Sequence, residues 1–115
     1  NYDFESAYHA VNSLLARRAD FTALFAMSDV IALGAIRALV SAGLRVPEDV
    51  SVIGYDDTAL AAASLPQITS VTHPKDIMGE DAADCLLQML RGEIVQPRQH
   101  LYQPKLIERQ SVVRL

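Results

Sequence analysis

Two short apolar runs with a helical segment between them restrict the fold of this chain most. The runs Phe21 to Met27 and Val50 to Tyr55 contain few polar residues, so we predict that each is a buried strand. The segment from about Val30 to Ala42 has the length and composition of a helix. A strand, a helix and a second strand form one βαβ unit, which predicts an α/β fold whose parallel sheet is covered on both faces.

Short polar and glycine signals mark the ends of the predicted helices. Ser28 and Asp29 supply N-cap chemistry ahead of the central helix, and Gly43 stands where a left-handed C-terminal cap is needed. Pro74 directly precedes a later helix, which Gly92 ends. These signals predict where both helices begin and end.

Hydrophobic spacing accounts for most of the remaining chain. Apolar residues at helical spacing predict an amphipathic helix near the start, and LPQITSVTH contains a third strand. The connection before this strand has room for only one or two turns of helix. Pro104 cannot donate a hydrogen bond within a central ladder, so it divides the tail into two short extended pieces. The predicted first helix, third strand, last helix and tail are residues 4–18, 68–72, 75–91 and 100–109.

The composition is that of one soluble globular domain. Half of the 115 residues are hydrophobic, which suffices for one core, and no apolar run is long enough to cross a bilayer. The formal net charge of −4 argues against a surface that grips the phosphates of nucleic acid. The sequence begins without Met and without a signal-like leader, so we expect a piece of a longer protein.

The single cysteine is predicted to be a core residue. Cys85 has no second cysteine with which to form an internal disulfide, which fits a reducing compartment. It falls with Met78, Ala82 and Met89 on the apolar stripe of the predicted last helix. We therefore expect Cys85 to pack in the core.

Polar side chains stand at the carboxyl ends of the three predicted strands. Ser28 follows the first, Asp56 the second and His73 the third. Ligands of parallel α/β sheets bind outside the carboxyl ends of the strands. A carboxylate, a hydroxyl and an imidazole together can donate to and accept from the hydroxyl groups of a sugar or similar polyol. The pattern predicts a polar ligand site at this rim.

Each of these residues also has a purely structural explanation. Asp56 and Asp57 can cap the turn or the short helix that follows, and we expect that role for Asp57. Ser28, with the aspartate after it, fits helix capping better than ligand contact on spacing alone. His73 can be an ordinary loop residue, and Tyr2 can be an ordinary surface aromatic.

The chain has no motif for catalysis, for a metal or for a cofactor. It has no GxSxG, no paired Cys/His spacing and no glycine-rich phosphate loop. We therefore expect no catalytic residue, no metal site and no cofactor, and we predict that the chain is not an enzyme.

Three blocks of sequence, together and in order, carry a resemblance to a known family. They are FAMSDVIALGAIRAL, VPEDVSVIGYDD and LIERQSV, with LPQITSVTHPKDIMGEDAADCLLQML at the expected distance between the last two. In this combination the chain resembles the effector-binding domain of the LacI/GalR (lactose/galactose repressor) family of bacterial transcription regulators. The resemblance covers residues 1–115 as the carboxy-terminal subdomain alone. The family's helix-turn-helix, its hinge helix and most of its amino-terminal subdomain have no counterpart here.

The resemblance implies a periplasmic-binding-protein-like fold built from Rossmann-like, parallel-sheet subdomains. A small effector would lie between two subdomains, change their relative orientation and thereby alter the affinity of a repressor for operator DNA. Only the absent amino-terminal domain would hold DNA, and the protein would be cytoplasmic with no membrane partner. The alternative that shares this fold is a fragment of a periplasmic sugar-binding protein of a transporter.

Four residues match positions at which members of the family contact the effector. Asp56, the first acid of GYDD, matches the position that hydrogen-bonds the effector, and Tyr2 falls where relatives place a Trp or Phe that stacks on it. Ser28 stands where several sugar-responsive members carry Asn, and His73 where many carry Gln. The resemblance implies a sugar or sugar derivative as effector, with purines as the alternative.

The central helix also predicts a contact between two copies of the chain. Between its caps it carries a single charge, Arg37, whereas an ordinary surface helix would show a polar face. Val30, Leu33 and Gly34 lie away from the predicted sheet-facing side and need cover, either within a larger monomer or, as the resemblance implies, in a homodimer suited to a palindromic operator. The sheet-facing residues are Ala32, Ala35, Ile36, Leu39 and Val40. The residues expected in the dimer interface are Val30, Leu33, Arg37, Ser64 and Leu65.

Overall fold

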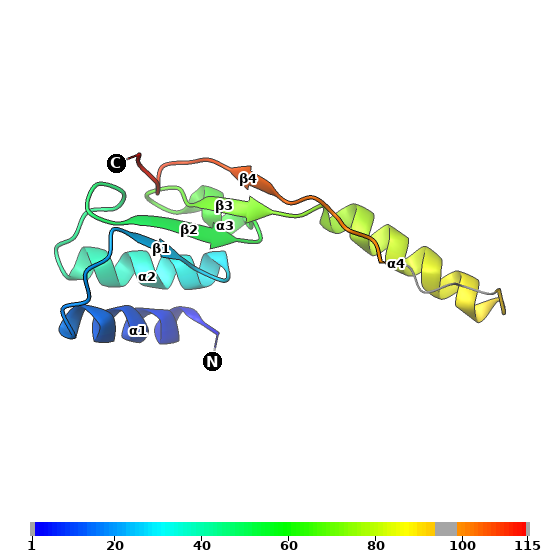
Figure 1. The fold of residues 1–115 in the computed structure, drawn as a ribbon, viewed down its shortest axis with the longest axis horizontal. Coiled ribbons are helices and arrows are strands. Elements are labelled where there is room, and N and C mark those ends of the chain that lie inside the picture. Colours follow the sequence, from blue (N-terminus) through cyan, green and yellow to red (C-terminus); the bar gives the residue numbers. More distant parts are fainter. Residues whose placement is uncertain (1, 94–98, 115) are drawn as a thin grey trace. The chain divides into compact units, whose positions relative to one another are not determined.

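Strands alternate with helices along the chain, and the strands form one sheet in the order β1-β2-β3-β4 (Figure 1). The computed structural model describes residues 2–93 and 99–114. The chain divides into one unit of residues 1–72 with 106–115 and a second unit of residues 73–105. The elements are α1 (Phe4–Ala16), β1 (Ala23–Phe25), α2 (Asp29–Ser41), β2 (Ser51–Tyr55), α3 (Ala59–Ala63), β3 (Thr69–Thr72), α4 (Lys75–Leu90) and β4 (Lys105–Ile107).

β1, β2 and β3 are parallel neighbours, as the sequence predicts. Ile53 of β2 is in register with Phe25 of β1 on one side and with Thr69 of β3 on the other. β4 lies beside β3 and runs opposite to it (Figure 1). The predicted α/β fold with a parallel sheet is therefore confirmed, with an antiparallel strand added at one edge.

α2 begins and ends where the sequence predicts. Ser28 is its N-cap, and the Oγ of Ser28 accepts a hydrogen bond from the backbone N–H of Ile31 at 3.3 Å. At the other end Gly43 has φ +83°, and the N–H of Leu44 donates to the carbonyl of Leu39 at 3.0 Å, as in a Schellman cap. The buried residues of α2 that belong to the core are Ala32, Ala35, Ile36, Ala38 and Leu39.

α1 packs on α2 and covers one of the α2 surfaces that the sequence leaves unexplained. A Cβ at Gly34 would collide with the carbonyl oxygen of Phe4 and lie 3.0 Å from the Cβ of Ala7. Leu33 is partly buried against the core. Of the two kinds of cover left open for Gly34, the structure shows cover within the monomer, because α1 approaches Gly34 too closely for any side chain. Val40, predicted to face the sheet, is instead half-exposed on the flank of the buried stripe.

β1 is an edge strand, which differs from the buried strand that we expected. Successive side chains of a strand point to opposite faces. Leu24 and Ala26 accordingly pack in the core with α2, whereas Phe25 is 61% exposed and Met27 is exposed as well. The apolar run therefore buries one of its two faces within this unit. The other face, which holds Phe25, is not covered by α2.

The second unit consists of α4 and the segment that leads to β4. α4 agrees with the predicted helix, and Gly92 follows it at φ +75°. No residue of α4 is buried, and Cys85, Met78 and Met89 are exposed. Core packing of Cys85 is therefore not observed, because in the described part of this unit no other helix or strand packs on the apolar stripe of α4.

The tail forms one strand where two extended pieces were expected. β4 follows Pro104, as predicted, but residues 100–103 are not in a strand. The hydroxyl of Tyr102 instead donates to Oδ2 of Asp81 on α4 at 2.6 Å. This hydrogen bond lowers the pKa of Asp81 and raises the pKa of Tyr102.

An ion pair closes the turn before β2. Arg45 donates to Asp49 from Nε at 2.9 Å and from Nη2 at 2.6 Å, and the backbone N–H of Arg45 adds a third hydrogen bond at 2.8 Å. These hydrogen bonds stabilise the charged carboxylate and lower the pKa of Asp49 to about 2. The turn is thus held by a charge pair at its surface.

We expect the Asp49 carboxyl group of the folded protein to titrate at about 2, below its ordinary pKa of 3.8. Because the folded pKa is the lower one, the pair stabilises the fold fully above pH 3.8, and this contribution is lost as the pH falls towards 2. The chemical shift of the carboxyl carbon, followed by NMR, measures the midpoint. In an Arg45→Gln variant the midpoint should rise; an identical midpoint in both proteins would contradict the assignment.

Candidate functional site

The candidate site lies at the end of the first unit where the parallel strands finish. β2 and β3 end there, and α1 and α2 begin there (Figure 1). Asp56 follows β2, Ser28 is the N-cap of α2, and Tyr2 stands two residues before α1. These three predicted residues therefore belong to one end of the unit. His73 begins the second unit, so its place relative to the other three stays a prediction.

The turn after β2 holds two consecutive aspartates at positive φ. The values are +95° for Asp56 and +48° for Asp57. Such a backbone is unfavourable by about 1–3 kcal/mol and persists where the surrounding structure imposes it. The N–H of Asp56 still donates to the carbonyl of Val71 at 2.9 Å, so the ladder between β2 and β3 extends to this residue. The unusual backbone begins directly at the predicted effector residue.

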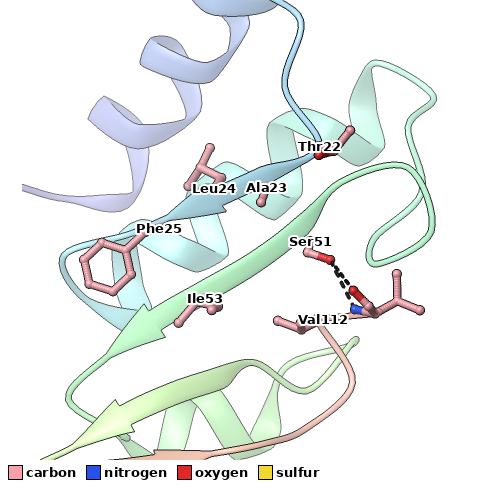
Figure 2. A pocket seen from close by; sticks show the side chains of 8 residues that line it. Thr22, Ala23, Leu24, Phe25, Ser51, Ile53 and Val112 are labelled. Atoms are coloured by element: carbon pink, nitrogen blue, oxygen red, sulfur yellow. Dashed lines mark hydrogen bonds between the residues drawn. The ribbon is translucent and has the colours of Figure 1, made fainter. Parts of the chain in front are cut away.

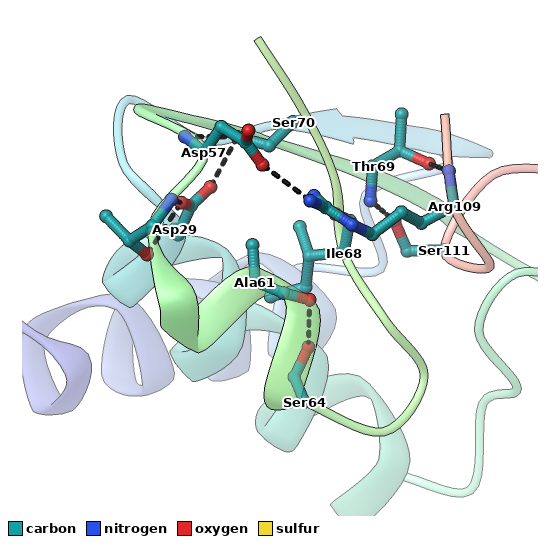
Figure 3. A network of polar contacts seen from close by, with 10 residues as sticks. Asp29, Asp57, Ala61, Ser64, Ile68, Thr69, Ser70, Arg109 and Ser111 are labelled. Atoms are coloured by element: carbon teal, nitrogen blue, oxygen red, sulfur yellow. Dashed lines mark hydrogen bonds and ion pairs between the residues drawn. The ribbon is translucent and has the colours of Figure 1, made fainter. Parts of the chain in front are cut away.

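Asp57 is held by an arginine from the tail of the chain. Nη2 of Arg109 donates to Oδ1 of Asp57 at 2.6 Å, and Nη1 donates to the carbonyl of Ile68 at 2.9 Å (Figure 3). α3 has Thr58 as its N-cap and no side-chain capping hydrogen bond. Asp57 therefore does not cap this helix, although its observed role is a structural one. The ion pair instead joins the GYDD block to the LIERQSV block.

A buried carboxylate supports the same turn. Asp29 is 1% exposed, and its Oδ2 accepts hydrogen bonds from the backbone N–H of Thr58 at 2.6 Å and from the Thr58 hydroxyl at 2.8 Å. Oδ1 accepts a hydrogen bond from the hydroxyl of Ser70 at 2.6 Å (Figure 3). Burial of a carboxylate is costly unless hydrogen bonds satisfy it, and these three do so.

Gly54 makes room for this carboxylate. A Cβ at position 54 would collide with Oδ1 of Asp29 and would lie 3.1 Å from Cγ2 of Ile68 and 3.4 Å from the Cβ of Ala32. The glycine of VIGYDD is therefore required by the aspartate of FAMSD, which is distant in the sequence.

The three candidate residues of the first unit each have a group that a ligand could contact. The Oγ of Ser28 accepts the capping hydrogen bond at 3.3 Å, and a hydroxyl retains its own O–H for a second partner. Asp56 is half-buried, and Tyr2 is 85% exposed. A carboxylate, a hydroxyl donor and an exposed aromatic ring are groups that can bind the hydroxyls and the apolar face of a sugar.

Sequence reasoning missed the residues that support the turn. Asp29 was interpreted as a helix cap, although Ser28 already fills that role, and Thr58, Ser70 and Arg109 were not singled out. The available signals were an additional acid directly after a capping serine and an arginine within the LIERQSV block. Neither signal predicts which residue the side chain contacts, because the contacting residues are far away in the sequence.

A hollow of about 450 Å³ lies elsewhere, between β1, β2 and the end of the tail (Figure 2). Its lining is mostly apolar and has no charged side chain, and the N–H of Val113 donates to Oγ of Ser51 across it at 3.1 Å. None of the candidate residues lines it, so it is not the predicted ligand site. The lining residues are Thr22, Ala23, Leu24, Phe25, Ser51, Ile53, Val112 and Val113.

Residues 2–93 and 99–114 contain neither a metal-binding cluster nor a membrane-spanning helix. No group of three or more His, Cys, Asp or Glu side chains in these ranges is arranged to hold a metal ion. None of the helices formed by the same residues has the length and apolar character needed to cross a membrane.

A parallel sheet with polar residues at the carboxyl ends of its strands is the architecture in which α/β proteins bind small ligands. Residues 1–112 match the family described as "Periplasmic binding protein-like domain". The chain therefore belongs to this family and, more narrowly, to the LacI/GalR family.

The curated relatives and several of the solved structures that this chain matches are transcription regulators, not enzymes. The chain is 39% identical over 111 residues to the transcriptional regulator CelR of Thermobifida fusca and 40% identical over 112 residues to the repressor PurR of Escherichia fergusonii. These matches span 96–97% of this chain but only 33% of each relative. Among structures, the CelR–cellobiose complex has a TM-score of 0.90 at 39% identity, covering 96% of this chain and 34% of that one. The lac repressor dimer bound to operator and the anti-inducer ONPF has a TM-score of 0.88 at 32% identity, covering 96% and 38%.

Proposed function

We propose that residues 1–115 are the carboxy-terminal, effector-sensing and dimerising subdomain of a bacterial repressor. A sugar or sugar derivative binds at the rim around Asp56, and its binding changes the affinity of the whole protein for operator DNA. DNA contact is assigned to a domain outside these residues, in keeping with their net charge of −4. The regulator acts in the cytoplasm and needs no membrane partner.

The observation that carries the proposal is the place of Asp56 directly after β2, on a backbone of positive φ. Asp57 is paired with Arg109 at 2.6 Å and serves the fold. Asp56 is half-buried at φ +95°, at the carboxyl end of a strand with neighbours on both sides. This is where parallel sheets bind ligands, and the strained backbone is the kind of feature that concentrates at binding sites.

The sugar preference has two supports. Asp56, Ser28 and Tyr2 supply an acceptor, a donor and an aromatic face at one end of the first unit, and His73 is proposed to add an imidazole from the second. The matched regulator CelR has been solved as a complex with cellobiose. Because the matched curated relatives are transcription regulators, they favour the regulator over the transporter fragment.

Asp56→Ala is expected to weaken effector binding about 100-fold, because a carboxylate that accepts two hydrogen bonds contributes about 3 kcal/mol. The test is a thermal-shift screen of the protein as its gene encodes it, against cellobiose, monosaccharides, sugar phosphates and purines. Ligand at a hundredfold excess over Kd stabilises the folded state by about 2.7 kcal/mol, which moves the melting curve visibly. Calorimetry then gives the Kd of the hit.

The matched control is Asp20→Ala, which removes an exposed carboxylate from the loop after α1 and should leave the Kd unchanged. A sugar-induced shift that survives Asp56→Ala would show that Asp56 is not an effector residue. A shift with purines alone would overturn the sugar preference and leave the regulator assignment standing.

α2 and α3 offer the surface for the proposed homodimer. α3 packs on α2, and the exposed apolar residues on these two helices and just beyond them include Val30, Val40 and Leu65. Arg37 lies on the same side of α2, since residues 30, 37 and 40 follow helical spacing. Leu33 is partly buried against the core and Ser64 is partly buried, so of the five predicted interface residues Val30, Arg37 and Leu65 are the most available. Exposed apolar residues beside a single charge suit a twofold contact.

Leu65→Glu is expected to convert the dimer into a monomer at micromolar concentration, because a carboxylate would be buried without a partner at the interface. Leu65 is 90% exposed, so the substitution should not disturb the fold of the single chain. Sedimentation velocity measures the change. The control is Leu101→Glu, at a position that is 94% exposed in the second unit. Equal dimerisation of both variants would contradict this interface.

A further inference from the structure

We propose that Asp29 is a positioning residue of the effector site, which holds the Asp56 carboxylate in place without touching the effector. The proposal rests on the proposed role of Asp56 and deepens it. Asp29 is 1% exposed, and its three hydrogen bonds all go to residues of the unit itself, so a ligand at the rim meets its neighbours instead.

Hydrogen bonds to the two residues after Asp56 fix the backbone that orients its side chain. The hydroxyl of Ser70 has one proton, which it donates to Asp29 at 2.6 Å, so its lone pairs are free to accept the N–H of Asp57 at 3.1 Å. The N–H of Thr58 donates to Asp29 directly at 2.6 Å. The carboxylate of Asp29 therefore holds the N–H of Thr58 directly and the N–H of Asp57 through the hydroxyl of Ser70.

The carboxylate itself has little freedom to move. Its Oδ1 lies over Gly54, where even a methyl group would collide with it. Asp29 is also the first residue of α2 and is covalently joined to Ser28, whose Oγ caps the same helix. The side chain thus links the start of α2 to the turn after β2. One buried group therefore fixes the turn that follows Asp56 to the start of α2.

The turn needs this support because its backbone is unfavourable. Asp56 at φ +95° and Asp57 at φ +48° would relax if the amides of residues 57 and 58 lost their acceptors. A relaxed turn would keep the Asp56 carboxylate but point it elsewhere. Effector affinity would then fall although no contacting residue had changed.

Hydrogen exchange tests the positioning without any ligand. The variants are Asp29→Asn, which keeps the shape but replaces an acceptor by an NH₂ group, and Ser70→Ala, which cuts only the link from Asp29 to Asp57. We expect the amide of Asp56, which bonds Val71 and not Asp29, to exchange at least tenfold faster in both. The amide of Val52, bonded to Ser111, should not change. Equal acceleration at Asp56 and Val52, or none at Asp56, would overturn the proposal.

Ligand affinity tests the consequence. The probe is the compound that binds the full-length protein most tightly among cellobiose, glucose, galactose, adenine and guanine. We expect Asp29→Asn to weaken the Kd at least tenfold, and less than twofold when Asp56 is already alanine, because the effect passes through Asp56. Asp20→Asn is the charge-matched control and should change neither the exchange rates nor the Kd.

The outcomes separate this inference from the proposed function. If Asp56→Ala alone leaves the Kd unchanged, the proposed role of Asp56 fails, while the exchange experiment still decides whether Asp29 holds the turn. If Asp56→Ala weakens binding but Asp29→Asn weakens it equally in both backgrounds, Asp29 acts on stability alone and the positioning role fails.

Discussion

Replacing Gly54 by alanine is expected to lower the free energy of unfolding by about 3 kcal/mol, at the upper end of the usual penalty for overpacking. The new Cβ would collide with Oδ1 of Asp29 and press on Cγ2 of Ile68, which is 3.1 Å away. The carboxylate cannot give way without losing its hydrogen bonds to Thr58 and Ser70. Urea denaturation followed by circular dichroism measures the loss.

The Asp29→Ala background provides the matched control for this substitution. Removal of the carboxylate empties the space above Gly54, so the added methyl group should cost less than about 1 kcal/mol there. A penalty of equal size in both backgrounds would contradict the explanation of Gly54, because the collision would then not involve Asp29.

Gly34→Ala is expected to destabilise the fold by about 2 kcal/mol, although alanine is favoured over glycine inside a helix by about 1 kcal/mol. The Cβ would collide with the carbonyl oxygen of Phe4 and lie 3.2 Å from the carbonyl carbon, and this backbone cannot rotate away as a side chain can. α1 would have to move off α2. Thermal unfolding measures the net change in stability from the helix preference and the collision together. Faster hydrogen exchange throughout α1 would show that the loss comes from the contact between α1 and α2.

Gly79→Ala is the control for the helix effect alone. Gly79 lies within α4, and a Cβ there would have no neighbour within 4 Å. This substitution should stabilise its helix by up to about 1 kcal/mol. A Gly34→Ala protein that is as stable as the wild type would show that α1 does not pack on α2 as described.

The elements themselves could be predicted from the sequence because their signals are local. Ser28 and Gly43 mark the ends of α2 through hydrogen bonds that span three to five residues. The strands β2 and β3 and the short helix α3 follow from runs of like residues. The rim at the ends of the parallel strands then follows from the βαβ order alone, which is why Asp56 could be selected as a site residue.

Burial was predicted less well, because a hydrophobic pattern does not say what covers it. Phe25 and Cys85 belong to apolar patterns, yet both side chains are exposed. Gly34 was expected to need cover from a larger monomer or from a second copy, and the structure covers it with α1, which is distant from it in the sequence. In each case the deciding quantity is which other element lies against the residue.

The sequence by itself determined the α/β class, the order of strands and helices, the caps and the position of Asp56 at the rim, since each depends on residues close together in the chain. Only the tertiary structure decided that Asp29 supports the turn, that Arg109 holds Asp57 and that Gly54 must lack a side chain. Those contacts join residues 41 and 52 positions apart in the cases of Asp29 with Ser70 and Asp57 with Arg109. A buried charge or hydrogen-bond donor can be satisfied by many residues, and only the folded backbone brings one particular partner within reach.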